Sequence, residues 1–189
     1  ICSGIAEDKS YLGLEHISMH PGDKNSWLRM GQLLARMHQN WSSNEYGSHR
    51  DNYIGKTSQP NPNLQDWPHF YSEHRIGHLL HQLVDKGINL FAVDKTINLV
   101  ANRLAGHHPK ASLLHGDLWS GNVGFHKETP VIYDPAVYYG DRETDIAMSE
   151  LFGGFPSSFY RGYNEVWPLD EDYLERKPVY QLYHLLNHA

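Results

Sequence analysis

Apolar residues recur every three or four positions in several long stretches of the chain, which is the spacing of an amphipathic helix. The first of these stretches predicts a helix that begins near Asp23 or Asn25, two residue types that cap helices well. It places four apolar side chains on one face: Trp27, Met30, Leu34 and Met37.

The later helical stretches have clearer end signals. A helix is predicted over 67–87, because Asp66 can cap it, Pro68 lies in its first turn and Gly87 follows its end. Another is predicted over 93–106, with a buried face formed by Ile97, Val100, Ala101 and Leu104. Three further helices are predicted at about Asp141–Leu151, Phe159–Val166 and Pro178–His188.

Strand patterns are fewer and shorter. Apolar residues at Tyr11, Leu12 and Leu14 predict a strand within 10–19 that runs into a connector. Two apolar runs, "NVGF" and "PVIYD", are separated by the polar turn "HKET" and predict a β-hairpin. The pattern as a whole therefore predicts a mainly helical α+β protein with one small hairpin.

The stretch from Trp41 to Asp66 is rich in Ser, Asn, Gly and Pro, and it is predicted to be a long loop. A loop of this length in a compact domain usually has a function.

Composition narrows the class of protein. The chain has 189 residues, of which 40% are hydrophobic and 20% charged, as in globular proteins. The net charge of −6 and the absence of a basic run argue against binding to nucleic acid, and no apolar stretch is long enough to span a membrane. The lone Cys2 fits a reducing compartment, so a cytoplasmic location is predicted. Because the chain starts at Ile1 and ends in "LLNHA", we expect it to be part of a longer polypeptide.

Histidine is frequent, with fourteen residues in the chain. His74, His78 and His81 share one face of a predicted helix, where imidazoles either bind a metal or line solvent or a substrate groove. No carboxylate or cysteine completes a recognisable ligand set, so the second interpretation is favoured.

The hairpin carries the residues with the clearest chemistry. Asp117 and Asn122 flank the loop before its first strand, and Asp134 ends its second strand. Adjacent antiparallel strands bring Asn122 near Asp134, and carboxamide and carboxylate oxygens suit a hard cation such as Mg²⁺. Asp117 is then free to orient a substrate hydroxyl and accept its proton, as phosphoryl transfer requires.

Asp and Asn are also common turn residues, so one of them alone would indicate nothing more than a turn. The spacing His-x-Asp-x4-Asn, followed twelve residues later by Asp after an apolar strand, is far more specific. It is the pattern of the catalytic loop and metal-binding aspartate in protein-kinase-like folds.

The longer segments around this pattern resemble one family, the fructosamine kinases or ketosamine 3-kinases. The resemblance rests on "LLHGDLWSGNV", "VIYDPAVYYGDRETDIAM", "LFGGFP", "FYRGYNEVWPL" and "RKPVYQLYHLLNHA", and extends to "YGSHRDNYIGKTSQPN". The tryptophan two residues after Asp117 distinguishes it from generic kinases, and details such as "GDRETDIAM" resemble its bacterial branch.

The resemblance implies a two-lobed, aminoglycoside-phosphotransferase-like fold. Residues 1–20 would be the last strand of the N-terminal lobe and the hinge, and 21–189 the mainly helical C-terminal catalytic lobe, with both ends incomplete. It also implies ATP-dependent phosphorylation of the 3-hydroxyl of a ketosamine, free or protein-bound, in deglycation repair. The glycine-rich phosphate loop and its lysine are expected to lie outside this chain, so the chain alone is expected to turn over negligibly.

Site residues follow from the same resemblance. Asp117 would be the catalytic base, Asn122 and Asp134 the Mg²⁺ ligands. A hinge formed by Glu15, His16 and Ile17 would hold the adenine of ATP through backbone groups.

Six further residues have two interpretations each. Asp145 either props the catalytic loop by accepting backbone N–H bonds or is an ordinary helix charge. His115 either shapes the loop or takes part in the chemistry, and the first is favoured. Trp119 either stacks on a sugar or anchors the loop in the core. The side chains of the long loop either bind hydroxyls or nucleotide or are plain surface: His49, Asp51 and Asn52.

Other functions stay open at this level. The three catalytic positions set the chemistry and not the acceptor, so an aminoglycoside, choline or homoserine kinase is the main alternative. A catalytically inactive kinase-like binding module is another, although Asp117, Asn122 and Asp134 are all present. The preferred ketosamine and the oligomeric state cannot be predicted.

Overall fold

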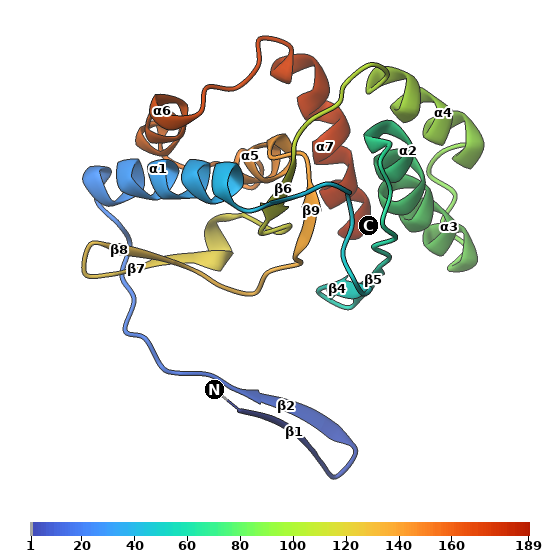
Figure 1. The fold of residues 1–189 in the computed structure, drawn as a ribbon. Coiled ribbons are helices and arrows are strands. Elements are labelled where there is room, and N and C mark those ends of the chain that lie inside the picture. Colours follow the sequence, from blue (N-terminus) through green and yellow to red (C-terminus); the bar gives the residue numbers. More distant parts are fainter. Residues whose placement is uncertain (1) are drawn as a thin grey trace.

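The computed structural model describes residues 2–189, so the first residue of the predicted segment 1–20 lies outside the described residues (Figure 1). The chain forms a mainly helical α+β body from which an N-terminal hairpin projects. The helices are α1 (Lys24–Asn40), α2 (Trp67–Tyr71), α3 (His78–Asp85), α4 (Val93–Arg103), α5 (Glu143–Ser149), α6 (Ser157–Val166) and α7 (Tyr173–Asn187). A π-helical turn η1 (Ser72–Gly77) joins α2 to α3, and a 3₁₀ turn η2 (Ser120–Asn122) precedes β7.

The strands are short and, within residues 2–189, form four separate sheets. They are β1 (Cys2–Ala6), β2 (Lys9–Gly13), β3 (Ser42–Ser43), β4 (Asn52–Ile54), β5 (Thr57–Gln59), β6 (Ala111–Leu114), β7 (Val123–His126), β8 (Thr129–Ile132) and β9 (Tyr138–Gly140). The pairs β1–β2, β4–β5 and β7–β8 are antiparallel hairpins, and β3–β6–β9 is an antiparallel sheet with β6 in the middle.

Helix α1 begins where the sequence predicts. The carboxylate of Asp23 accepts a hydrogen bond from Ser26 N at 2.8 Å, which satisfies one of the free N–H groups of the first turn. Met30 and Leu34 are buried, and Trp27 and Met37 pack against the core from its margin.

The predicted helix 67–87 is also confirmed, as the continuous run α2–η1–α3. Asp66 caps it, and Gly87 ends it with a left-handed φ of +80°. The aromatic residues at its start build the centre of the core with α7: Trp67, Phe70, Tyr71 and Tyr180.

Four predictions of secondary structure need correction. The hydrophobic pattern missed β6 and β9, because strands of three or four residues contain too few alternating positions for a period to be detected. The stretch from Trp41 to Asp66, predicted to be one long loop, contains β3 and the β4–β5 hairpin, so the predicted hairpin is not alone. Helix α7 begins at Tyr173, five residues before the predicted start, with Pro178 inside it. The predicted strand within 10–19 is shorter, Lys9–Gly13, and pairs with the unpredicted β1.

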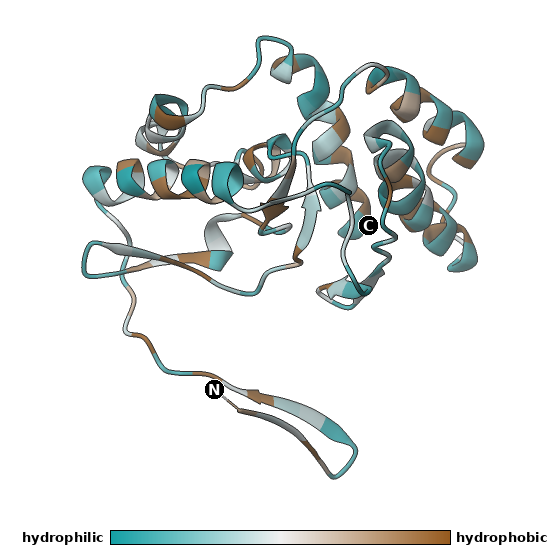
Figure 2. Ribbon diagram, in the orientation of Figure 1, coloured by the Kyte–Doolittle hydropathy of each residue, from teal (hydrophilic) through white to brown (hydrophobic). Residues whose placement is uncertain are grey.

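Figure 2 shows how hydrophobic residues are distributed over the body. Strand β6 is hydrophobic, whereas the helices around it alternate between hydrophobic and hydrophilic residues along their length. This is the expected pattern for a buried strand covered by amphipathic helices. Within residues 2–189, no helix has both the length and the apolar character that crossing a bilayer requires.

Helices α1 and α6 approach each other closely at two glycines. A Cβ atom on Gly31 would lie 2.1 Å from Phe159 O, and one on Gly162 would lie 2.1 Å from Leu28 O. The backbones therefore touch where no side chain intervenes, and this crossing fixes α1 against the C-terminal half of the chain.

Candidate active site

The loop that follows β6 carries the predicted catalytic residues, and a buried carboxylate holds its start. Asp145 Oδ2 accepts a hydrogen bond from His115 N, and Asp145 Oδ1 accepts one from Gly116 N, both at 2.8 Å. Gly116 has a φ of +81°, and a Cβ atom there would lie 2.1 Å from Ala136 O, so only glycine fits this turn. The contacts of Asp145 are thus those of a residue that props the loop.

Asp145 has a second partner on α1. His38 Nε2 lies 3.2 Å from Asp145 Oδ2, and His38 Nδ1 lies 2.8 Å from the hydroxyl of Tyr163. Burial alone would raise the pKa of Asp145, but the hydrogen bond and charge of His38 and the bond from Gly116 hold it below its ordinary value. Asp145 is therefore an ionised acceptor for the two loop N–H groups.

His115 joins the loop to the strand end that carries Asp134. Its Nε2 lies 3.0 Å from Tyr133 O, and its Nδ1 accepts a bond from Asp117 N at 3.3 Å. A carbonyl can only accept and a backbone N–H can only donate, so the network assigns the neutral tautomer with the proton on Nε2.

Asn122 bridges the two predicted acidic site residues. Its Nδ2 donates to Asp117 O at 2.9 Å, to Asp117 Oδ2 at 3.1 Å and to Asp134 O at 3.5 Å. The hairpin register sets this arrangement, because Val123 pairs with Ile132 and Tyr133 N donates to Asn122 O. The structure therefore brings the three residues together.

The surroundings of Asp117 make its carboxylate a stronger base than that of an ordinary aspartate. Its carboxyl is partly buried, and desolvation raises its pKa above the ordinary aspartate value, with the charge of Asp134 adding to the rise. The hydrogen bond from Asn122 and the charge of His188 oppose this rise. A carboxylate with a raised pKa beside hydrogen-bond donors is typical of a general base.

The predicted hinge residues lie in the segment between β2 and α1. Glu15 and His16 are exposed and Ile17 is half-buried. The segment then joins the edge of β7, because His20 N donates to Phe125 O at 2.9 Å and Phe125 N donates to His20 O at 3.1 Å. A cavity of about 290 Å³ lies beside this junction, lined mainly by apolar groups, among them Met19, Trp27, Val123, Gly124 and Tyr133.

Trp119 is part of an aromatic group next to Asp117. Its ring lies edge-on to Phe152, with centroids 6.3 Å apart, and Phe152 lies edge-on to His188 at 5.1 Å. Trp119 is 36% exposed and Phe152 48%, so part of the Trp119 ring is covered and part faces solvent beside the loop. The sequence pattern does not indicate Phe152 or His188 as site residues. The one local signal is the "FGG" run, where Phe152 has a left-handed φ of +51°.

The three predicted residues of the long loop differ in their surroundings. His49 is exposed, with Ser48 as its hydrogen-bond neighbour. Asp51 Oδ1 accepts from Asn61 N at 2.7 Å. Asn52 donates to Val137 O at 2.8 Å, so it contacts the segment that follows Asp134.

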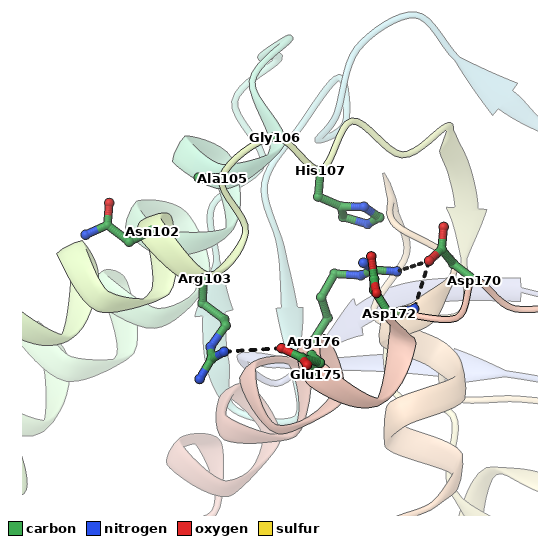
Figure 3. Close-up of a pocket in the computed structure, with 9 residues that line it drawn as sticks. All are labelled: Asn102, Arg103, Ala105, Gly106, His107, Asp170, Asp172, Glu175 and Arg176. Atoms are coloured by element: carbon green, nitrogen blue, oxygen red, sulfur yellow. Dashed lines mark hydrogen bonds and ion pairs between the residues drawn. The ribbon is translucent and has the colours of Figure 1, made fainter.

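A further cavity lies away from these residues, between the end of α4 and the start of α7 (Figure 3). It encloses about 540 Å³, and charged side chains that pair with one another line it. Arg103 pairs with Glu175 at 3.5 Å, and Arg176 with Asp170 at 3.5 Å. The pairing leaves little net charge to recognise a ligand.

One group of metal-type ligands borders that cavity. In the part of the chain that the structure describes, only His107, Asp141 and Glu143 bring such atoms within 4.8 Å of one another. Both Glu143 oxygens accept from Arg176 at 2.8 Å, and Asp141 accepts from Tyr180 and lies 2.7 Å from His107 Nε2, so hydrogen bonds already use these atoms. The face of His74, His78 and His81 forms no such group within 2–189.

The α+β fold and the loop that holds Asp117, Asn122 and Asp134 together are typical of kinase-like proteins, and comparison with known proteins identifies the family. The sequence model described as "Fructosamine kinase" matches residues 1–189. The chain therefore belongs to the fructosamine kinase family, as the sequence resemblance implies.

Individual relatives agree. The chain is 46% identical over 189 residues to a probable ketoamine kinase of Vibrio cholerae, and 45% identical over 187 residues to one of Escherichia coli K12. It covers 66% and 65% of these proteins, so it spans about two thirds of the relatives it matches. A crystal structure assigned as a fructosamine-3-kinase of Haemophilus somnus is 40% identical, with a TM-score of 0.95 over 98% of this chain and 63% of that one.

Proposed function

We propose that this chain is the catalytic lobe of a kinase that transfers phosphate from ATP to the 3-hydroxyl of ketosamines, in deglycation repair. The observation that carries the proposal is the Asn122 bridge between Asp117 and Asp134 at the end of the β7–β8 hairpin. Membership of the fructosamine kinase family supports the acceptor class.

Asp117 is proposed as the catalytic base. Its carboxylate would orient the acceptor hydroxyl and take its proton, and its raised pKa suits this task. The hydrogen bond from Asn122 Nδ2 fixes Asp117 Oδ2, which leaves Oδ1 for the substrate. The propped loop contributes by holding the carboxylate in one geometry.

The donor set next to Asp117 fits Mg²⁺. Because Asn122 Nδ2 faces Asp117, the amide oxygen of Asn122 is available as a ligand, and Asp134 adds an exposed carboxylate. When bound, Mg²⁺ would neutralise charge on the phosphates of ATP. The backbone of Glu15, His16 and Ile17 is proposed to hold the adenine, which would enter the neighbouring apolar cavity.

The acceptor side is proposed to lie at Trp119, whose exposed ring can stack on a sugar next to the base. Substrate contact by His49, Asp51 and Asn52 also stays a proposal. Residues 2–20 are proposed as the last strand and hinge of an N-terminal lobe, and 21–189 as the catalytic lobe. The exposed apolar side chains of the projecting hairpin, such as Ile5 and Leu12, support this division.

The test uses the protein restored to the length of its relatives. ATP consumption with Mg²⁺ is measured on a ribulosamine, a fructosamine, choline and an aminoglycoside. We expect turnover on a ketosamine, reduced about 10²- to 10⁴-fold by Asp117→Asn because a general base contributes that much. Turnover only on choline or the aminoglycoside would refute the acceptor, and binding of ATP without turnover would indicate a binding module. The 189-residue chain alone is expected to be nearly inactive.

A further inference from the structure

Asp134 has a backbone conformation that the residue itself does not favour. Its φ is +55°, in the left-handed region that residues other than glycine rarely occupy. Such a conformation persists only where the surroundings fix it. Two backbone hydrogen bonds hold the chain on either side of Asp134. Tyr133 N donates to Asn122 O at 3.1 Å, and Ala136 N donates to His115 O at 2.8 Å.

Side chains of the site add the bonds from His115 to Tyr133 O and from Asn122 to Asp134 O, and the long loop supplies two more. Gln59 Nε2 donates to Ala136 O at 3.1 Å, and Asn52 Nδ2 donates to Val137 O at 2.8 Å. Asn52 and Gln59 face each other across the β4–β5 hairpin, which lies beside the connection from β8 to β9 (Figure 1). The side chains of Asn52 and Gln59 therefore project from the same end of the hairpin and both bind the segment that follows Asp134.

The other atoms of the two carboxamides are also in use. Asn52 Oδ1 accepts from Gln59 at 2.8 Å and from Asn61 at 2.9 Å, and Gln59 Oε1 accepts from the hydroxyl of Tyr183 at 2.8 Å. With this set of partners each amide has a single orientation that satisfies it. Gln59 is buried, so its bonds are shielded from competing water.

A buried arginine anchors the hairpin end. Arg75 Nη2 donates to Asn61 Oδ1 and Arg75 Nη1 to Pro60 O, both at 2.7 Å. The guanidinium is fully buried and lies 4.6 Å and 4.0 Å from the ring centroids of Phe70 and Tyr138. The π-helical turn η1, from which Arg75 projects, thus links the core to the long loop.

We propose that Asn52 and Gln59, anchored through Asn61 and Arg75, are positioning residues that hold Asp134 for metal binding. The proposal rests on the proposed function, because it takes Asp134 as a Mg²⁺ ligand. It assigns a role to the long loop that differs from direct substrate contact. Loss of either donor would free the segment after Asp134 and weaken the metal site, whereas binding of the acceptor at Trp119 would change little.

Two isosteric variants, made in the protein at the length of its relatives, test this. Asn52→Asp removes the donor to Val137 O, and Gln59→Glu removes the donor to Ala136 O while keeping an acceptor for Tyr183. Ser58→Ala is the matched control, since Ser58 lies on the same hairpin but bonds to His78 and Gln82 on the other side. Asn52 is only half-buried, so its variant is expected to fold even if Gln59→Glu does not.

The two readouts are the Mg²⁺ concentration for half-maximal turnover and hydrogen exchange of the Ala136 amide. We expect both variants to raise the Mg²⁺ concentration for half-maximal turnover about three- to tenfold, which is the effect of one lost hydrogen bond. The KM for the acceptor should change little. Exchange at Ala136 should accelerate by a similar factor, and Ser58→Ala should change neither.

Unchanged Mg²⁺ dependence and unchanged exchange in Asn52→Asp would overturn the proposal. An equal effect of Ser58→Ala would also overturn it, because the hairpin would then act only through general stability. If the unsubstituted protein phosphorylates no ketosamine, the proposed function fails separately. Ala136 exchange and direct Mn²⁺ binding, measured with and without each substitution, then still decide the positioning role.

Discussion

At the scale of single residues, the acid–base properties of Asp117 follow from its burial. Desolvation raises its pKa, and the nearby His188 lowers it. Because a general base acts in its deprotonated form, kcat/KM should fall at acid pH as Asp117 takes up a proton, at a higher pH than for an ordinary aspartate. The pH profile of kcat/KM measures this limb.

His188→Gln provides the control for that assignment. It removes a charge that favours the ionised carboxylate, so the acid limb should move to still higher pH. A limb that stays in place would show that another group controls the profile.

The buried pair of His38 and Asp145 yields a prediction of stability. His38→Ala would leave an Asp145 oxygen and the Tyr163 hydroxyl with one partner fewer, and would open a cavity in the core. Unpaired buried polar groups and lost packing together predict a loss of about 3–5 kcal/mol in the free energy of unfolding. Denaturant unfolding measures it, with the exposed His81→Ala as the control within about 0.5 kcal/mol. Equal losses in both variants would contradict the prediction.

The same residues show what sequence can predict at this scale. Asp117, Asn122 and Asp134 lie on one loop and one hairpin, so local spacing and strand register place them together. Phe152 contacts Trp119, and His188 lies near enough to lower the pKa of Asp117, both from segments far along the chain. The bonds of Asn52 and Gln59 to the segment after Asp134 cross 85 and 77 residues. Such contacts depend on tertiary packing, which periodicity does not encode.

At the scale of elements, the crossing of α1 and α6 depends on Gly31 and Gly162. Gly162→Ala would place a methyl group 2.1 Å from Leu28 O, so the helices must separate. Overpacking of this kind predicts a loss of about 1–3 kcal/mol of unfolding free energy. Thermal or denaturant unfolding measures it. Arg161→Ala, on the exposed side of α6, is the control and should cost less than about 0.5 kcal/mol.

The element scale also explains which parts of the fold were predictable. Helix α1 has a sustained period of 3.6, and the run α2–η1–α3 has clear signals at both ends. Both begin at capping aspartates, and their predicted limits agree with the structure to within a few residues. The central sheet was not predicted, because β3, β6 and β9 are only two to four residues long. They are stabilised by pairing with one another across the sheet. Short strands that pair only across long separations leave little trace in the local pattern.

At the scale of the whole molecule, a buried histidine couples folding to pH. His184 on α7 lies in the core, and burial lowers its pKa to about 3. In the unfolded chain its pKa is about 6.5, so below that pH the unfolded state binds a proton that the folded state does not. The unfolded state is then favoured, and the free energy of unfolding falls by about 1.4 kcal/mol for each pH unit below about 6.5.

Between pH 6.5 and pH 5 this contribution amounts to a loss of about 2 kcal/mol. Asp145 does not affect this slope, because its pKa is lowered in the folded protein. The stability that its ionised form contributes is lost only when the pH falls below the ordinary pKa of an aspartate. Denaturant unfolding at pH 7.5, 6.5, 5.5 and 5.0 measures the slope. His184→Gln removes the titrating ring, so its stability, although lower at pH 7.5, should change less with pH, and parallel curves for the two proteins would refute the assignment.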